Sequence, residues 1–87
     1  MGVERFTINE SPIPDRIIVE LIINGLTCRG VVKNGIYYII EGVINPNCQC
    51  VTSHQLKSIA PSQIEYWSYL NPTISPRIHE LFKELLI

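Results

Sequence analysis

Charged residues are scarce in this 87-residue sequence, and neither sign dominates. They make up 17% of the chain, below the roughly one quarter that soluble proteins carry, and the net charge at pH 7 is −1. Because so small a net charge creates no long-range field, we do not expect non-specific attraction to nucleic acid or anionic lipid to drive binding. An apolar content of 46% also argues against a disordered chain.

Long apolar runs and catalytic motifs are missing as well. No run approaches the roughly 18 to 20 apolar residues of a transmembrane helix, and residues 1–5 contain no signal-peptide core. No phosphate-binding loop is present. We therefore expect residues 1–87 to be one small cytoplasmic domain that is not an enzyme, has no membrane partner and uses no cofactor.

Alternating apolar and polar residues over 16–43 indicate β-strands, because side chains on a strand repeat with a period of two. Asn24-Gly25 and Asn34-Gly35 are the dipeptides preferred in two-residue hairpin turns. Together they predict a three-stranded antiparallel meander. A helix over residues 14–24 is the competing interpretation.

The turns also set a register, which sorts the side chains onto two faces. With Ile23 opposite Leu26, the first face of the hairpin is apolar and pairs Leu21 with Cys28, Val19 with Gly30 and Ile17 with Val32. The third strand adds Tyr37, Ile39, Glu41 and Val43 to this face. The second face pairs Ile22 with Thr27, Glu20 with Arg29, Ile18 with Val31 and Arg16 with Lys33. The second turn places Lys33 opposite Ile36, so the third strand adds Ile36, Tyr38 and Ile40 to this face. Glu20 opposite Arg29 is a favourable cross-strand pair. The third strand is apolar on both sides, so the chain's own helices or another molecule must cover the second face.

The rest of the chain predicts further strands and then helices. Residues 6–8 could form a short first strand and residues 48–51 a fourth one, while residues 52–59 fit either a helical turn or a last strand. Ser62 and Glu65 have the spacing of a capping box and predict a short helix that ends before Pro72. Its apolar side would carry Ile64, Trp67 and Leu70, with Tyr66 and Tyr69 together on a neighbouring side.

A final helix is predicted from Ser75, with Pro76 at its first position. Its apolar stripe is formed by Ile78, Leu81, Phe82 and Leu85. His79 lies off this stripe and is expected at the surface.

The predicted fold class is thus α+β: an antiparallel β-meander of three to five strands, at about residues 16–52, followed by two C-terminal helices within about residues 62–87. In strand number and length the sheet resembles a small SH3-like barrel with helical additions. No family motif accompanies this likeness.

The favoured function is a small non-catalytic protein-binding module, such as an adaptor, regulator or inhibitor subunit. Low charge and surplus apolar surface suggest it, and its partner would be another protein or a second copy of the chain, as a homodimer. Binding would use the apolar second face or the C-terminal helix. The candidate contact residues are Ile18, Arg29, Val31, Ile36, Tyr38, Ile40, Tyr66, Tyr69 and Phe82.

Two alternatives remain open. The first is a metal-binding or redox-sensing protein that uses Cys28, Cys48, Cys50 and His54, although the usual second cysteine pair of a zinc site is missing. The second is a small-barrel nucleic-acid binder, for which the basic residues on one sheet face are too few; these are Arg16, Arg29 and Lys33.

Overall fold

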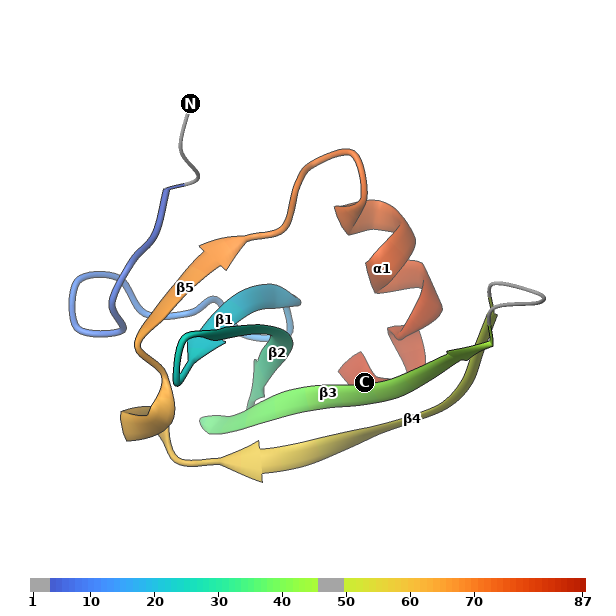
Figure 1. The fold of residues 1–87 in the computed structure, drawn as a ribbon, viewed down its shortest axis with the longest axis horizontal. Coiled ribbons are helices and arrows are strands. Elements are labelled where there is room, and N and C mark those ends of the chain that lie inside the picture. The colour runs from blue at the N-terminus through green and yellow to red at the C-terminus, as the bar shows by residue number, and fades with distance from the viewer. Residues whose placement is uncertain (1–3, 46–49) are drawn as a thin grey trace.

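A computed structural model describes residues 4–45 and 50–87, and the side chains of residues 4–41 and 55–87. Five antiparallel strands form one sheet in the order β4-β3-β2-β1-β5 (Figure 1). The strands are β1 (Val19–Ile23), β2 (Leu26–Lys33), β3 (Ile36–Asn45), β4 (Cys50–Ile59) and β5 (Tyr66–Tyr69). The described residues also form one α-helix, α1 (Ser75–Leu81), and two 3-10 turns, η1 (Pro61–Gln63) and η2 (Lys83–Leu86). The protein is therefore α+β, with a β-meander as predicted but one α-helix where two are predicted.

Both Asn-Gly turns lie where the sequence predicts them. The two asparagines have φ angles of 53° and 54°, and the glycines 77° and 79°. Positive φ at both central residues is the geometry of the hairpin turn that Asn-Gly favours. Ile23 pairs with Leu26 across the first turn, and Lys33 pairs with Ile36 across the second, both as predicted. The competing helix over residues 14–24 is wrong.

The first strand begins later than predicted. The alternating pattern starts at Arg16, whereas β1 starts at Val19. Arg16 has a left-handed φ of 58°, and its N–H donates to the carbonyl oxygen of Val32 at 2.8 Å. The predicted pairs of Arg16 with Lys33 and of Ile17 with Val32 are therefore wrong, because the segment before β1 meets β2 in another register, with a parallel bridge between Asp15 and Val32.

β2 changes its partner at Gly30. The strand pairs with β1 from Leu26 to Gly30, and with β3 from Gly30 to Lys33. A Cβ atom at Gly30 would lie 2.3 Å from Cδ1 of Leu21 and 2.8 Å from the carbonyl oxygen of Tyr38. The missing side chain therefore allows both neighbouring strands to approach β2 closely where the pairing changes.

Two clusters of buried apolar side chains divide the core, and they follow the two predicted faces. The first cluster consists of Ile13, Val19, Leu21, Val32, Ile64 and Trp67. The second consists of Ile18, Val31, Leu70 and Phe82, flanked by Tyr38, Ile40, Leu56, Ile78, Leu85 and Leu86. Because Phe82 and Ile78 come from the α1 region, the chain's own C-terminal segment covers the second face (Figure 1).

Residues 62–70 do not form the predicted helix. They contribute the end of η1 and then β5, which pairs with β1. Gln63, rather than Glu65, closes the turn by accepting the N–H of Ala60 at 3.0 Å. The carboxylate of Glu65 instead accepts the N–H of Gly25 at 2.9 Å. Pairing with β1 overrides the local capping signal here, because local propensity is weaker than tertiary contacts.

The C-terminal helix begins at Ser75, with Pro76 at its start, as predicted. It is only seven residues long. Within residues 4–45 and 50–87, no helix has the length and apolar character needed to cross a membrane.

Candidate functional site

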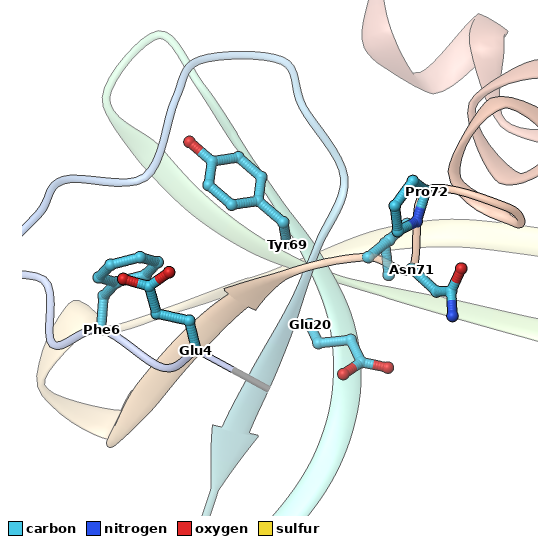
Figure 2. Close-up of a pocket in the computed structure, with 7 residues that line it drawn as sticks. Glu4, Phe6, Glu20, Tyr69, Asn71 and Pro72 are labelled. Carbon is cyan, nitrogen blue, oxygen red and sulfur yellow. The ribbon is translucent and has the colours of Figure 1, made fainter. Parts of the chain in front are cut away.

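A pocket of about 470 Å³ lies beside the C-terminal end of β5 (Figure 2). It is lined by Glu4, Phe6, Glu20, Tyr69, Leu70, Asn71 and Pro72. These residues come from the N-terminal segment, from β1, and from the end of β5 with the loop that leads to α1. Folding therefore brings together three parts of the chain that are far apart in the sequence.

Phe6 reaches the pocket because the N-terminal segment pairs with the outer edge of β5. The N–H of Phe6 donates to the carbonyl oxygen of Trp67 at 2.8 Å, and the N–H of Trp67 donates back to Phe6 at 2.8 Å. The two rings lie 4.9 Å apart between centroids. The indole N–H of the buried Trp67 also donates to the carbonyl oxygen of Ser11 at 2.8 Å. Trp67 thus anchors the segment that carries Glu4 and Phe6.

Tyr69 supplies the other aromatic ring of the pocket. Its ring meets Trp67 edge-on, with centroids 5.0 Å apart, and stands at 80° to the ring of Phe6 at 6.4 Å. Such edge-to-face arrangements are favourable for aromatic pairs. Tyr69 is nevertheless 53% exposed. Its ring is therefore held by its neighbours and is still open to a ligand.

Two carboxylates line the pocket, and no basic side chain does. Glu20 lies in β1 between Arg29 of β2 and Ser68 of β5. The predicted register of Glu20 and Arg29 is confirmed, but the ion pairs found among the described residues do not include them. Glu4 is exposed on the N-terminal segment. The pocket therefore carries negative charge that no lining residue balances.

The structure divides the nine predicted contact residues by exposure. Three belong to the second core cluster and are covered by the chain itself; they are Ile18, Val31 and Phe82, exposed by 1%, 2% and 6%. Partly buried are Arg29, Tyr38 and Ile40, and exposed are Ile36, Tyr66 and Tyr69. Burial under α1 occurs because the apolar stripe of the C-terminal segment matches the second face. A contact role for the exposed three stays a prediction.

Tyr66 and Tyr69 do not share a side, contrary to the prediction. Both lie on β5, at its first and last residues. Since successive side chains of a strand point to opposite faces, residues three apart lie on different faces. Only Tyr69 lines the pocket.

His79 is partly buried, so the prediction that it is a surface residue is wrong. The N–H of Ile18 donates to Nε2 of His79 at 2.9 Å, and Nδ1 lies 2.7 Å from the carbonyl oxygen of Ser75. Because Nε2 accepts a hydrogen bond, the neutral ring carries its proton on Nδ1 and donates it to Ser75. Nε2 thus ties α1 to the residue before β1, and the bond of Nδ1 to Ser75, within α1 itself, orients the ring.

Only one of the four predicted metal ligands can be placed. Cys48 and the side chains of Cys50 and His54 lie outside the described residues. Cys28 packs against the first core cluster, and burial raises the pKa of its thiol. Among the side chains that the structure describes, no three His, Cys, Asp or Glu residues gather as metal ligands would.

Most of the pocket was not foreseeable from the sequence pattern. Tyr69 is among the predicted contact residues, but Glu4, Phe6, Asn71 and Pro72 are not. A signal existed in the short strand predicted for residues 6–8, since Phe6 does form a bridge to β5. Its partner could not be deduced while residues 62–70 were interpreted as a helix.

Comparison of the chain with protein-family models, with curated proteins and with solved structures finds no match in any of the three.

Proposed function

We propose that this protein is a small, non-catalytic binding module, similar in architecture to SH3-like barrels, and that it binds a segment of another protein in the pocket beside β5. The observation that carries the proposal is the Tyr69 ring at this pocket, held edge-on by the buried Trp67 yet 53% exposed. Rigid aromatic side chains next to a hollow are common hot spots of protein binding.

The strand order supports the barrel-like architecture. β5 returns to pair with β1, and the short turn η1 lies between β4 and β5, the two edge strands of the sheet. β2 serves both halves of the sheet, pairing with β1 before Gly30 and with β3 after it. A meander bends in this way when it curls toward a small barrel, often at a glycine.

The lining of the pocket favours binding over catalysis. It contains no serine, threonine, cysteine, lysine or histidine, and its two carboxylates come from different segments, Glu4 from the N-terminal segment and Glu20 from β1. The side-chain oxygen of Asn71 accepts the N–H of Thr73 at 2.8 Å, which occupies it in shaping the loop. The aromatic and apolar wall offers contact area instead.

The contact surface in this proposal differs from the one expected from the sequence. The apolar second face is unsuitable because Ile18 and Val31 lie beneath the C-terminal segment. Arg16, one of the three basic residues predicted on the second face, is engaged in other contacts, since its guanidinium pairs with Asp15 and donates to Asn34. The metal-binding and nucleic-acid-binding alternatives stay predictions that no contact of a described side chain favours.

Peptide display against the full chain tests the proposal. We expect selection on the wild type to yield peptides that bind Tyr69→Ala about tenfold or more weakly, as loss of a hot-spot ring predicts. Tyr66→Ala is the matched control, because Tyr66 is 43% exposed on the same strand but faces the other side. Amide shifts of the ¹⁵N-labelled protein should move at Phe6, Glu20 and Tyr69.

Selected peptides that bind wild type and Tyr69→Ala equally, or that shift only the amides of α1, would contradict the proposal. Tyr69→Phe keeps the ring and should retain binding. This second variant separates loss of the aromatic contact from loss of the fold.

A further inference from the structure

The two edge strands of the sheet are covered to different degrees. The outer side of β5 is bridged by the N-terminal segment, through the two backbone hydrogen bonds between Phe6 and Trp67. β4 pairs with β3 on one side, and no segment of the described chain pairs with it on the other (Figure 1). An uncovered edge strand offers its unpaired N–H and C=O groups to another strand.

The alternation of hydrogen bonds shows which backbone groups of β4 point outward. The turn at Asn34-Gly35 closes with a hydrogen-bonded pair to β2, so from Tyr37 onward every second residue of β3 bonds to β4. The partners of these residues in β4 are Ile59, Lys57 and Gln55. Leu56 and Ser58 lie between them and therefore direct their N–H and C=O groups away from β3.

Ala60 supports this assignment, because it is the next residue in the same series. Its N–H donates to the side-chain oxygen of Gln63 at 3.0 Å, and its carbonyl oxygen accepts the N–H of Gln63 at 3.0 Å. The turn η1 thus closes the edge at Ala60. Within the described chain, no hydrogen bond reaches the outward groups of Leu56 and Ser58.

We propose that β4 pairs antiparallel with β4 of a second copy of this chain, about a two-fold axis at Leu56, and that the protein is thereby a homodimer with one continuous sheet. The edge of a strand is complementary to itself in this arrangement, because each copy offers the same alternating donors and acceptors. The surface is separate from the pocket beside β5, so the inference goes beyond the function proposed above.

The charged side chains select this register. β4 contains one residue with a formal charge, Lys57, which is exposed and forms no ion pair among the described residues. A two-fold axis at Lys57 would place two like charges opposite each other, which is unfavourable. With the axis at Leu56, each Lys57 lies opposite Gln55 of the second copy.

Gln55 is prepared to receive this lysine. Its Nε2 donates to Oε2 of Glu41 at 3.0 Å, which leaves the amide oxygen as an acceptor. Glu41 and Gln55 are both exposed. The ammonium group of Lys57 from the second copy can therefore donate to Gln55 and also meet the negative charge of Glu41 one strand further on.

Leu56 adds an apolar contact at the axis. It is partly buried and packs against the second core cluster, so its side chain lies on the face that the C-terminal segment covers. Residues opposite each other across an antiparallel pair have their side chains on the same face. The two copies of Leu56 would thus meet beside both C-terminal segments.

The first test measures association and its location in the full chain. Sedimentation velocity from about 10 μM to about 1 mM should show a monomer–dimer equilibrium. In hydrogen exchange, the amides of Leu56 and Ser58 should become more protected as the concentration rises, whereas the Lys57 amide is protected by β3 throughout. A mixture of labelled and unlabelled protein should give an intermolecular NOE between the Hα atoms of Gln55 and Lys57.

Charge variants test the register. Lys57→Glu should raise the dimer dissociation constant about five- to thirtyfold, because two-fold symmetry counts each lost contact twice. Gln55→Lys should also weaken the dimer, since the new lysine faces Lys57 of the second copy. The double variant Gln55→Lys/Lys57→Glu pairs opposite charges again and should return to within about threefold of the wild type. Arg77→Glu is the control, as an equal charge change at an exposed position of α1.

A protein that stays monomeric at about 1 mM, with rapidly exchanging Leu56 and Ser58 amides, would overturn the inference. So would a dimer that does not respond to the charge variants, or one that protects α1 in place of β4. Peptides that protect Leu56 and Ser58 without self-association would show that the edge takes a foreign strand. Tyr69→Ala should leave dimerisation unchanged, so a failure of peptide binding beside β5 is seen separately.

Discussion

The N–H of Ile18 donates a hydrogen bond to Nε2 of His79 at 2.9 Å, across 61 positions of the sequence. Ile18 is buried and lies one residue before β1, so its N–H has no ladder partner among the described strands. A buried N–H without an acceptor costs about 1–3 kcal/mol. The imidazole supplies that acceptor, and the same contact fixes α1 over the second core cluster.

We expect His79→Ala to lower the free energy of unfolding by about 1–3 kcal/mol, because the N–H of Ile18 loses its acceptor. His79→Gln places an amide oxygen near the position of Nε2 and should lose less. Urea denaturation of the two variants measures the difference. Arg77→Ala, an exposed change in the same helix, should stay within about 0.5 kcal/mol of the wild type.

The protonation pattern of the ring gives an independent check. With Nε2 accepting from Ile18, the proton of neutral His79 lies on Nδ1 and is donated to the carbonyl oxygen of Ser75. Long-range ¹H–¹⁵N NMR spectra distinguish the two tautomers. A neutral ring with its proton on Nε2 would contradict the hydrogen bond.

Gly30→Ala should destabilise the sheet by about 1–3 kcal/mol through overpacking. The new Cβ would lie 2.8 Å from the backbone oxygen of Tyr38, which cannot move without disturbing β3. Gly25→Ala is the comparison, because its Cβ meets nothing within 4 Å and its cost of about 1–2 kcal/mol comes only from the left-handed φ of 77°.

The two alanine variants therefore lose stability for different reasons, Gly30→Ala through overpacking and Gly25→Ala through backbone strain. Asparagine tolerates a left-handed conformation, so Gly25→Asn should recover most of the stability lost in Gly25→Ala, whereas Gly30→Asn should recover none. Thermal unfolding of the four variants tests this. A Gly30→Ala protein as stable as the wild type would show that β1 and β3 do not crowd β2.

Phe82→Ala should lower stability by about 3–5 kcal/mol, since Phe82 is buried in the second cluster. Leu81→Ala, at the adjacent but 44% exposed position, should cost about 1 kcal/mol or less. Unfolding free energies and the binding of a hydrophobic dye measure the effect, because loss of the cover exposes Ile18 and Val31. The milder Phe82→Leu keeps the comparison possible if Phe82→Ala unfolds, and similar losses at positions 81 and 82 would contradict the packing.

Thr7 and Glu10 form a small pH-dependent contact in the N-terminal segment. The Thr7 hydroxyl donates to Oε1 of Glu10 at 2.8 Å and the Thr7 N–H donates to it at 3.1 Å, and together they hold the pKa of Glu10 below its ordinary value. A carboxyl with a lowered folded-state pKa stabilises the fold above its unfolded-state pKa, and this contribution is lost as the pH falls through the folded-state value.

Thr7→Val removes the hydroxyl donor, which is the largest cause of the shift, so the pKa of Glu10 should rise toward its ordinary value. A ¹³C NMR titration of the side-chain carboxyl measures it. Thr7→Ser keeps the donor and should keep the pKa low. An unchanged titration midpoint in Thr7→Val would contradict the hydrogen bond.

The sequence predicted those parts of the fold that depend on neighbouring residues. Asn24-Gly25 and Asn34-Gly35 allow positive φ, so each turn and its first pair follow from local chemistry. The two apolar faces followed from the register, and the need to cover the second face followed from the third strand. Local patterns gave a wrong prediction where the secondary structure depends on a distant segment. Residues 66–69 form β5, which pairs with β1, and not the predicted helix.

The candidate site was less predictable than the fold for the same reason. Tyr69 could be singled out as an exposed aromatic residue, but its place beside Phe6 depends on the bridge between the N-terminal segment and β5. Glu20 could be assigned to a sheet face, yet the end of β5 decides that this face opens into a pocket there. Contacts between segments about 60 residues apart leave no periodic trace in the sequence.

By itself, then, the sequence determined the meander, its register from each turn as far as Val19–Gly30 in the first hairpin, and a third strand that is apolar on both sides, since turn chemistry and side-chain alternation act over a few residues. The tertiary structure alone decided that the C-terminal segment covers the second face, that His79 serves a backbone N–H, and that residues 66–69 form a strand. These outcomes depend on long-range pairing and burial, which local propensity does not encode.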